Sequence, residues 1–306
     1  MKIYINHSNE NWICDRMRKE FTENNSEHVT DDIAACDIIW LLSHWVWKQT
    51  PIEFLLNKKV ITTVHHIDPD KFDVQDFLIR DQFVNAYHSP TTKTTNHFPK
   101  LKQHKKQFII PYWCNKSLWY NIPNKQELKH KYSIPKGKLI IGSFQRDTEG
   151  HDLITPKLSK GPDIFCDVVE SLDVKPHVIL GGWRRQYIIS RLEKAGITYS
   201  YFEMANFTEL NELYNCLDYY LVTSRHEGGP QAVLESSLTE TPILSTDVGI
   251  AKDVLHENCI VNNPEDFKNL IQLNKYQYKD INYEAALKLD IKESSKNYLD
   301  MFRQVL

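Results

Sequence analysis

The chain has 306 residues, enough for two domains of roughly 100–200 residues each. Hydrophobic residues make up 41% and charged residues 25%, which are ordinary proportions for a globular protein and exclude a disordered or fibrous chain. The net charge of −3 argues against nucleic-acid binding driven by bulk charge.

Targeting and redox signals favour the cytoplasm. The chain enters a predicted strand at once and lacks the apolar core of a signal peptide. Its longest apolar run, Asp37–Leu42, is far too short to span a bilayer. The cysteines show no C-x-x-C spacing, so we expect buried thiols rather than a disulfide frame or a zinc site. They are Cys14, Cys36, Cys114, Cys166, Cys216 and Cys259.

Strand and helix patterns alternate along the chain, which predicts an α/β protein with parallel sheets. Strands of the first half are predicted at Lys2–Asn6, Asp37–Leu42, Lys59–Val64, Phe83–Tyr87 and Gln107–Ile110. The segment Asn11–Thr22 has the apolar spacing of an amphipathic helix, with Trp12, Met17 and Phe21 on its core face.

A polar segment at 121–136, with a proline near each end, is interpreted as an interdomain connection. A second set of strands follows it, at Lys138–Phe144, Lys175–Leu180, Ile197–Phe202, Asp218–Thr223, Pro242–Thr246 and Cys259–Val261. The chain ends in a long helical pattern over Asn282–Val305, either continuous or broken.

The most informative stretch is the junction between the strand Asp218–Thr223 and a predicted helix, Gln231–Glu240. Gly228, Gly229 and Pro230 lie at this junction. The free N–H groups and the positive dipole end of a helix N-terminus favour an anion, and glycines let the backbone approach a ligand closely. Pro230 suits the first helical position, where no N–H is needed.

Two glutamates accompany this junction, Glu227 before the helix and Glu235 inside it. A bound phosphate would repel Glu227, so we interpret this residue as an acceptor of hydrogen bonds from sugar hydroxyls. Glu235 could do the same for a ribose. Together with the segment 241–249, the junction predicts a nucleotide-sugar site. The alternative interpretation is a pair of solvated glutamates after an ordinary turn.

The same stretch resembles the retaining glycosyltransferases of family 4, whose signature is a Glu-x7-Glu pattern running from a glycine-rich turn into a helix. The matching elements are Glu227, Gly228, Gly229, Glu235, the strand Pro242–Thr246 and Val248-Gly249. The match is specific over roughly residues 137–262 and weaker over the N-terminal half.

The resemblance implies the GT-B fold, in which two Rossmann-like domains face each other across a cleft. We expect an acceptor-side domain at 1–120, a donor-binding domain at 121–285, and a last helix at 286–306 that crosses back to the first domain. The implied activity is transfer of a hexose, with retention of configuration, from a nucleotide diphosphate sugar, with UDP- and GDP-sugars as the expected donors. The implied acceptor is a glycan or a lipid-linked hydroxyl, and no metal or other cofactor is obligatory.

On the donor side, the family places an Arg and a Lys-Gly pair after the first strand of the second domain. Lys160-Gly161 matches the Lys-Gly pair, whereas Ser143 stands at the position of the Arg. Arg146 and Lys157 are therefore the alternative partners of the diphosphate. Gly228, Gly229, Pro230 and Gln231 complete the expected donor-binding set with Glu235.

In the first domain, the resemblance gives a catalytic role beside Glu227 to a histidine at a strand end. His65 aligns with it best and His66 is the alternative. Asp68-Pro69-Asp70 also fits the D-x-D pattern that binds a divalent cation in GT-A enzymes, but we interpret it as turn chemistry.

The acceptor side is the least specified. The loop after the first strand lacks the glycines that the family often carries there, and its candidate acceptor ligands are His7, Ser8 and Asn11. The segment 88–91 is a second candidate. The basic segment Lys93–Lys106 could rest on an anionic membrane surface or be a solvated loop. Two other functions stay open, a sugar-nucleotide epimerase of GT-B fold and a non-catalytic nucleotide-sugar-binding protein.

Overall fold

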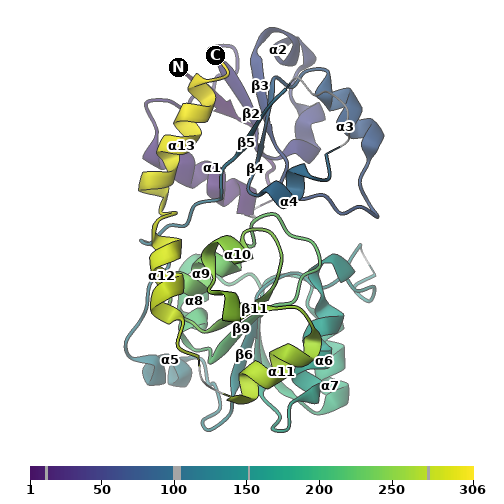
Figure 1. The fold of residues 1–306 in the computed structure, drawn as a ribbon, viewed down its shortest axis with the longest axis vertical. Coiled ribbons are helices and arrows are strands. Elements are labelled where there is room, and N and C mark those ends of the chain that lie inside the picture. Colours follow the sequence, from purple (N-terminus) through teal and green to yellow (C-terminus); the bar gives the residue numbers. More distant parts are fainter. Residues whose placement is uncertain (11–12, 99–104, 151, 274–275) are drawn as a thin grey trace. The chain divides into compact units, whose positions relative to one another are not determined.

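The structure is a computed structural model that describes residues 1–10, 13–98, 105–150, 152–273 and 276–306. The chain divides into two compact units (Figure 1). Unit 1 contains Met1–Trp113 and Leu289–Leu306, and unit 2 contains Cys114–Lys288. Each unit is built on a parallel sheet, which confirms the predicted fold class.

Unit 1 has five described strands in the order β1-β2-β3-β4-β5. They are β1 (Ile3–Ile5), β2 (Ile38–Leu41), β3 (Lys59–Thr63), β4 (Ala86–Ser89) and β5 (Lys106–Ile109). The strand β2 is apolar throughout because its side chains point alternately into two cores. Ile38 and Trp40 face one core, and Ile39 and Leu41 face the other.

Helices cover both faces of this sheet. On one face, α1 (Ile13–Asn24) packs against α13 (Ile291–Arg303), which confirms that the C-terminal helix returns to the first unit. The second face is covered by the 3-10 helix η1 (His44–Gln49), α2 (Ile52–Asn57) and α3 (Val74–Asp81). The short helix α4 (Thr92–Thr95) follows β4.

The strand β4 begins three residues later than predicted. The cause is Asn85, whose side-chain oxygen accepts the N–H of Val60 at 2.7 Å and holds the preceding residues in a turn after α3. His88 therefore lies inside the strand, is fully buried, and bonds Thr63 Oγ1 and the Ile110 carbonyl through its two ring nitrogens. The prediction of acceptor ligands at 88–91 is wrong for this residue.

Unit 2 has six described strands in the order β11-β10-β9-β6-β7-β8. They are β6 (Ile140–Ser143), β7 (His177–Gly181), β8 (Thr198–Phe202), β9 (Tyr219–Val222), β10 (Ile243–Thr246) and β11 (Ile260–Val261). The chain first extends the sheet on one side of β6 and then returns to its other side with β9. The pair β6 and β9 is therefore the topological switch point, where such sheets bind ligands at the carboxyl ends of the strands.

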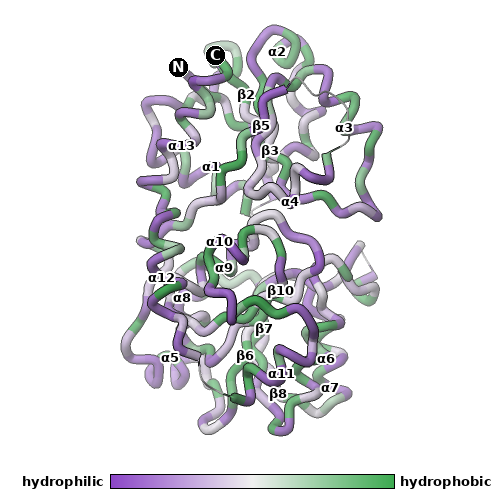
Figure 2. The backbone as a smooth tube through the Cα atoms, viewed as in Figure 1, coloured by the Kyte–Doolittle hydropathy of each residue, from purple (hydrophilic) through white to green (hydrophobic). Residues whose placement is uncertain are grey.

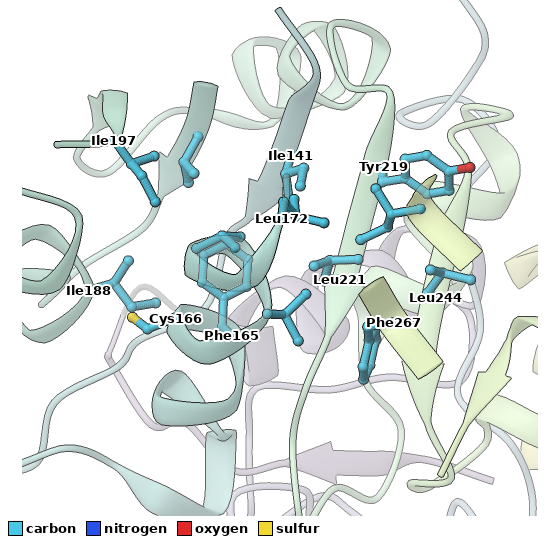
Figure 3. Packing of buried hydrophobic residues seen from close by; sticks show 14 of the residues in the cluster. Ile141, Phe165, Cys166, Leu172, Ile188, Ile197, Tyr219, Leu221, Leu244 and Phe267 are labelled. Atoms are coloured by element: carbon cyan, nitrogen blue, oxygen red, sulfur yellow. The ribbon is translucent and has the colours of Figure 1, made fainter. Parts of the chain in front are cut away.

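The core of unit 2 consists of apolar side chains from the strands and the surrounding helices. Figure 3 shows Ile141, Leu221 and Leu244 of three neighbouring strands together with Phe165 of α6 and Phe267 of α11. The tube through β6 and β7 is correspondingly coloured as hydrophobic in Figure 2. The surrounding helices are η2 (Leu158–Lys160), α6 (Pro162–Ser171), α7 (Gln186–Ala195), α8 (Phe207–Asn215), α9 (Gln231–Leu238), α10 (Ala251–Val254), η3 (Glu257–Cys259) and α11 (Pro264–Leu273).

Two segments contain helices that the sequence pattern did not delimit. The polar stretch 121–136 contains a helix, α5 (Lys125–Lys131), which packs on α8 within unit 2. Its pattern was too polar to reveal a helix because only Leu128 of α5 is buried. The terminal helical pattern is broken into α12 (Lys279–Leu287) and α13.

Two further findings concern sequence features. All six cysteines are buried, as predicted, and none of them forms a disulfide in the described part of the chain. None of the helices in the described ranges is long and apolar enough to cross a membrane.

Candidate functional site

The predicted donor residues of unit 2 come together where β6 and β9 end. The loop after β9 is joined to the segment before α6 by backbone bonds, because Arg225 N–H and His226 N–H both donate to the carbonyl of Ser159. Thr223 Oγ1 also donates to the carbonyl of Gly161 at 2.8 Å. The two segments that carry Glu227 and Lys160 are thereby fixed against each other.

Lys160 and Glu227 form a direct ion pair across this joint. Lys160 Nζ lies 2.5 Å from Glu227 Oε1, and the two side chains are only 19% and 10% exposed. Ser224 Oγ donates to the same carboxylate oxygen at 3.1 Å. Glu227 thus offsets the positive charge of Lys160.

Arg146 and Lys157 lie near this pair, so the structure brings all three predicted cations together. Burial is the main cause that lowers the pKa of Lys157 to about 8, and the charges of Lys160 and Arg146 lower it further. Arg146 and Lys160 also line one small recess at the end of β6. Three cations concentrated at one point favour a polyanion such as a diphosphate.

The lowered pKa of Lys157 predicts that the affinity for a nucleotide diphosphate depends on pH. A bound diphosphate favours the charged form of Lys157, so binding above about pH 8 requires proton uptake. Nucleotide diphosphate affinity should therefore fall as the pH rises through about 8, by up to about tenfold per pH unit. Without ligand, the folded state binds fewer protons than the unfolded state above that pH, so Lys157 should make unit 2 more stable as the pH rises. Calorimetric titration of UDP between about pH 7 and about pH 9.5 measures the first effect.

Lys157→Gln supplies the control for this titration. The variant should bind UDP more weakly at neutral pH and lose the steep dependence of affinity on pH. A dependence equally steep in the variant would assign the proton uptake to another group.

The helix α9 begins at the glycine-rich turn, as predicted from the sequence. Pro230 is its N-cap residue rather than its first helical residue, and this residue makes no side-chain cap hydrogen bond. The turn packs tightly against the loop after β10. A Cβ on Gly249 of that loop would lie 2.1 Å from the carbonyl oxygen of Gly228. Gln231 follows Pro230 as the first residue of the helix.

Glu235 lies one turn into this helix and is 8% exposed. Its Oε2 accepts a hydrogen bond from the hydroxyl of Tyr214 at 2.9 Å. Tyr214 is fully buried against Tyr220, whose hydroxyl accepts the backbone N–H of Phe144 after β6. The carboxylate expected to bind ribose is therefore held in one orientation by a phenol that the sequence pattern did not reveal.

A buried ion pair beneath the recess was also missed. The guanidinium of Arg185 is fully buried and donates to the carbonyls of Ser143 and Gly181, the last residues of β6 and β7. It also donates to the Ser143 hydroxyl at 3.0 Å and to Asp147 Oδ2 at 3.2 Å. Burial raises the pKa of Asp147 and lowers that of Arg185, while each charge opposes the shift in its partner. Arg185 thus ties two strand ends together and positions the loop that carries Arg146.

In unit 1, both ring nitrogens of His65 are hydrogen-bonded to other protein groups. Nε2 bonds the carbonyl of Leu42 at 2.7 Å, which requires the hydrogen on Nε2, so the hydroxyl of Tyr112 donates to Nδ1 at 2.5 Å. Burial lowers the pKa of His65 to about 4, and the ring is neutral at physiological pH. A sugar hydroxyl could bond this ring only by displacing one of these partners. His66 is half-buried beside it.

Two predicted acceptor residues, His7 and Ser8, follow the end of β1. The hydroxyl of Ser8 donates to Asp15 at 2.9 Å, and burial with the nearby charge of Arg18 lowers the pKa of His7. Asn11 lies outside the described residues. In the D-x-D segment, Asp68 Oδ1 accepts the N–H of Asp70 at 3.2 Å, which is the geometry of a turn.

Part of the chain matches a known protein family. Residues 153–273 match the family described as glycosyl transferases group 1. The O-antigen chain mannosyltransferase RfbU of Salmonella typhimurium is 22% identical over 287 residues, which cover 86% of this chain and 79% of that protein.

Two solved structures share the fold over almost the whole chain. Anabaena HepE, solved in complex with UDP and glucose, has a TM-score of 0.75 and 11% identity, with 99% of this chain and 100% of that chain covered. Sucrose-phosphate synthase from Thermosynechococcus elongatus has a TM-score of 0.72 and 13% identity, with 98% and 80% covered.

The fold is that of a GT-B protein. Residues 153–273 match the group 1 glycosyltransferases, also called family 4, and the chain is a glycosyltransferase that transfers a sugar from a nucleotide sugar. It is therefore an enzyme of the class that the Glu-x7-Glu pattern predicted.

Proposed function

We propose that the chain transfers a hexose from a UDP- or GDP-sugar to a hydroxyl of a glycan or lipid-linked acceptor, with retention and without an obligatory metal. Unit 2 binds the donor and unit 1 binds the acceptor. The observation that carries the proposal is the convergence of Lys160, Lys157 and Arg146 on Glu227, beside the start of α9.

Each group has a physical role in this reaction. The cations and the helix N-terminus stabilise the negative charge that develops on the diphosphate as it leaves. Glu235 accepts hydrogen bonds from the ribose, and Glu227 accepts them from the transferred sugar. The carboxylate of Glu227 also turns the ammonium of Lys160 toward the sugar side of the diphosphate.

Retention follows from attack on the face that the diphosphate leaves. The acceptor hydroxyl then gives its proton to the departing phosphate oxygen, so no protein nucleophile is needed. His65 is neutral and both of its ring nitrogens have protein partners. We therefore assign it to the shape of the site rather than to proton transfer, and His66 takes the place of candidate sugar ligand.

The names of the relatives support the substrate class. RfbU is described as a mannosyltransferase of the O-antigen chain, and HepE was solved with UDP and glucose. Both descriptions involve hexoses, and one names the O-antigen chain. Membrane contact through Lys93–Lys106 gains no support from Lys105 and Lys106, whose ammonium groups bond Asp81 and the Gln304 carbonyl within unit 1.

A screen of nucleotide sugars tests the proposal. Thermal unfolding and slow sugar release should be measured with UDP-, GDP-, dTDP- and ADP-sugars, with and without EDTA. We expect stabilisation by one nucleotide family and release of sugar that EDTA does not reduce.

The rival functions give other outcomes. An epimerase would convert the donor without any acceptor, and a non-catalytic binder would be stabilised without releasing sugar. Activity that is strictly metal-dependent would indicate that Asp68 and Asp70 bind a divalent cation. If none of the nucleotides stabilised the protein, the proposed donor site would be wrong.

A further inference from the structure

An exposed aromatic ring stands at the carboxyl end of the sheet of unit 1. Trp45 directly follows the first residue of η1, just after β2, and 44% of its surface is exposed. Its ring lies 5.4 Å from that of His44 and 5.7 Å from that of His65, both measured between centroids. The indole thus packs against two half-buried imidazoles, while much of it faces solvent.

An exposed carboxylate lies beside this ring. Trp45 Nε1 donates to Glu10 Oε1 at 3.0 Å, whereas Glu10 Oε2 makes no hydrogen bond to the described residues. The position of Glu10 is fixed, because its backbone N–H donates to Asp15 Oδ2 at 2.8 Å. The pair is therefore preorganised rather than a chance contact of two long side chains.

The two loops that carry the pair are locked together. Asn6 Nδ2 donates to the carbonyl of Ser43 at 2.8 Å, and the N–H of Ser43 donates back to Asn6 Oδ1 at 3.0 Å. Both side chains are buried. This pair of hydrogen bonds joins the loops that follow β1 and β2, so Glu10 and Trp45 lie on one rigid edge of the unit.

We propose that Trp45 and Glu10 form a subsite for one pyranose ring of the acceptor. A pyranose has an apolar face of C–H groups, which packs on the negatively charged face of an indole. Its hydroxyl groups lie at the ring edge, where the free oxygen of Glu10 accepts a hydrogen bond. This inference rests on the proposed function and names the acceptor chemistry of unit 1.

Among the described residues, one further tryptophan is strongly exposed, and it lacks this arrangement. Trp183 is 43% exposed, but the guanidinium of Arg184 lies over its ring at 4.0 Å. Within the described residues, no cation stacks on Trp45. A membrane surface fits Trp45 poorly, because anionic headgroups would be repelled by Glu10.

Saturation-transfer NMR tests the subsite with simple probes. The methyl pyranosides of mannose, glucose, galactose and N-acetylglucosamine should be offered to the full chain with saturating UDP. We expect at least one to receive saturation, strongest at the C–H protons of one ring face. Trp45→Ala should reduce these signals by about tenfold, Trp45→Phe should retain part of them, and Glu10→Gln should reduce them.

Trp183→Ala is the matched control and should leave the signals at the wild-type level. Absence of pyranoside signals in the wild type, or signals unchanged in Trp45→Ala, would overturn the subsite. So would loss of binding to phosphatidylglycerol vesicles in Trp45→Ala with pyranoside signals unchanged. UDP binding in the same samples separates the two proposals, because its absence rejects the donor site whatever the pyranosides do.

Discussion

Glu227→Gln is expected to abolish sugar transfer while UDP still binds. The substitution removes the negative charge of the group that accepts hydrogen bonds from the sugar hydroxyls. The rate of transfer should therefore fall by on the order of a hundredfold to a thousandfold. The same change frees Lys160 from its 2.5 Å ion pair and removes a negative charge from beside the diphosphate. UDP affinity should therefore stay unchanged or rise by up to about tenfold.

Steady-state transfer rates and calorimetric UDP titration measure the two effects. Glu149→Gln is the control, because Glu149 also raises the pKa of Lys157 by its charge, yet it has no role in the proposed reaction. This control should transfer sugar at close to the wild-type rate. If Glu227→Gln lost UDP binding and transfer to the same degree, Glu227 would belong to the nucleotide pocket and its assignment to the sugar would be wrong.

The parts of the site that could be predicted from sequence are those contained in one short segment. The turn at Gly228 and Gly229, the start of α9, and the Lys160-Gly161 pair are local patterns, and the structure contains each of them. Their meeting at the switch point follows from the alternation of strands and helices, because parallel strands end at one edge.

The missed partners are pairs of residues far apart in the chain. Tyr214 reaches Glu235 from α8, and Arg185 reaches Ser143 from the loop after β7. Glu10 reaches Trp45 across 35 positions. Nothing in the spacing of a single sequence selects one such partner among many tyrosines, arginines or glutamates. The shifted start of β4 has the same origin, since Asn85 acts through a bond to another strand.

The other large effect that we expect is loss of stability in Gly161→Ala. Gly161 has φ +62° and lies between Lys160 and the first residue of α6. A Cβ at this position would lie 1.8 Å from the carbonyl oxygen of Thr223, which is backbone and cannot rotate away. Left-handed strain of about 1–2 kcal/mol adds to overpacking of about 1–3 kcal/mol. The unfolding midpoint of unit 2 should therefore fall by on the order of 10 °C.

Gly137→Ala separates these two causes. Gly137 has a similar backbone conformation, with φ +74°, but no atom lies within 4 Å of its Cβ position. This control should show the backbone strain alone and lower the midpoint by only a few degrees, about 3 °C. Scanning calorimetry of both variants with and without UDP decides the point. Because the clash separates the α6 start from the end of β9, Gly161→Ala should also lose most of the stabilisation by UDP, whereas Gly137→Ala should keep it. Equal shifts in the two variants would mean that Thr223 moves aside and that the joint between β9 and α6 is not rigid.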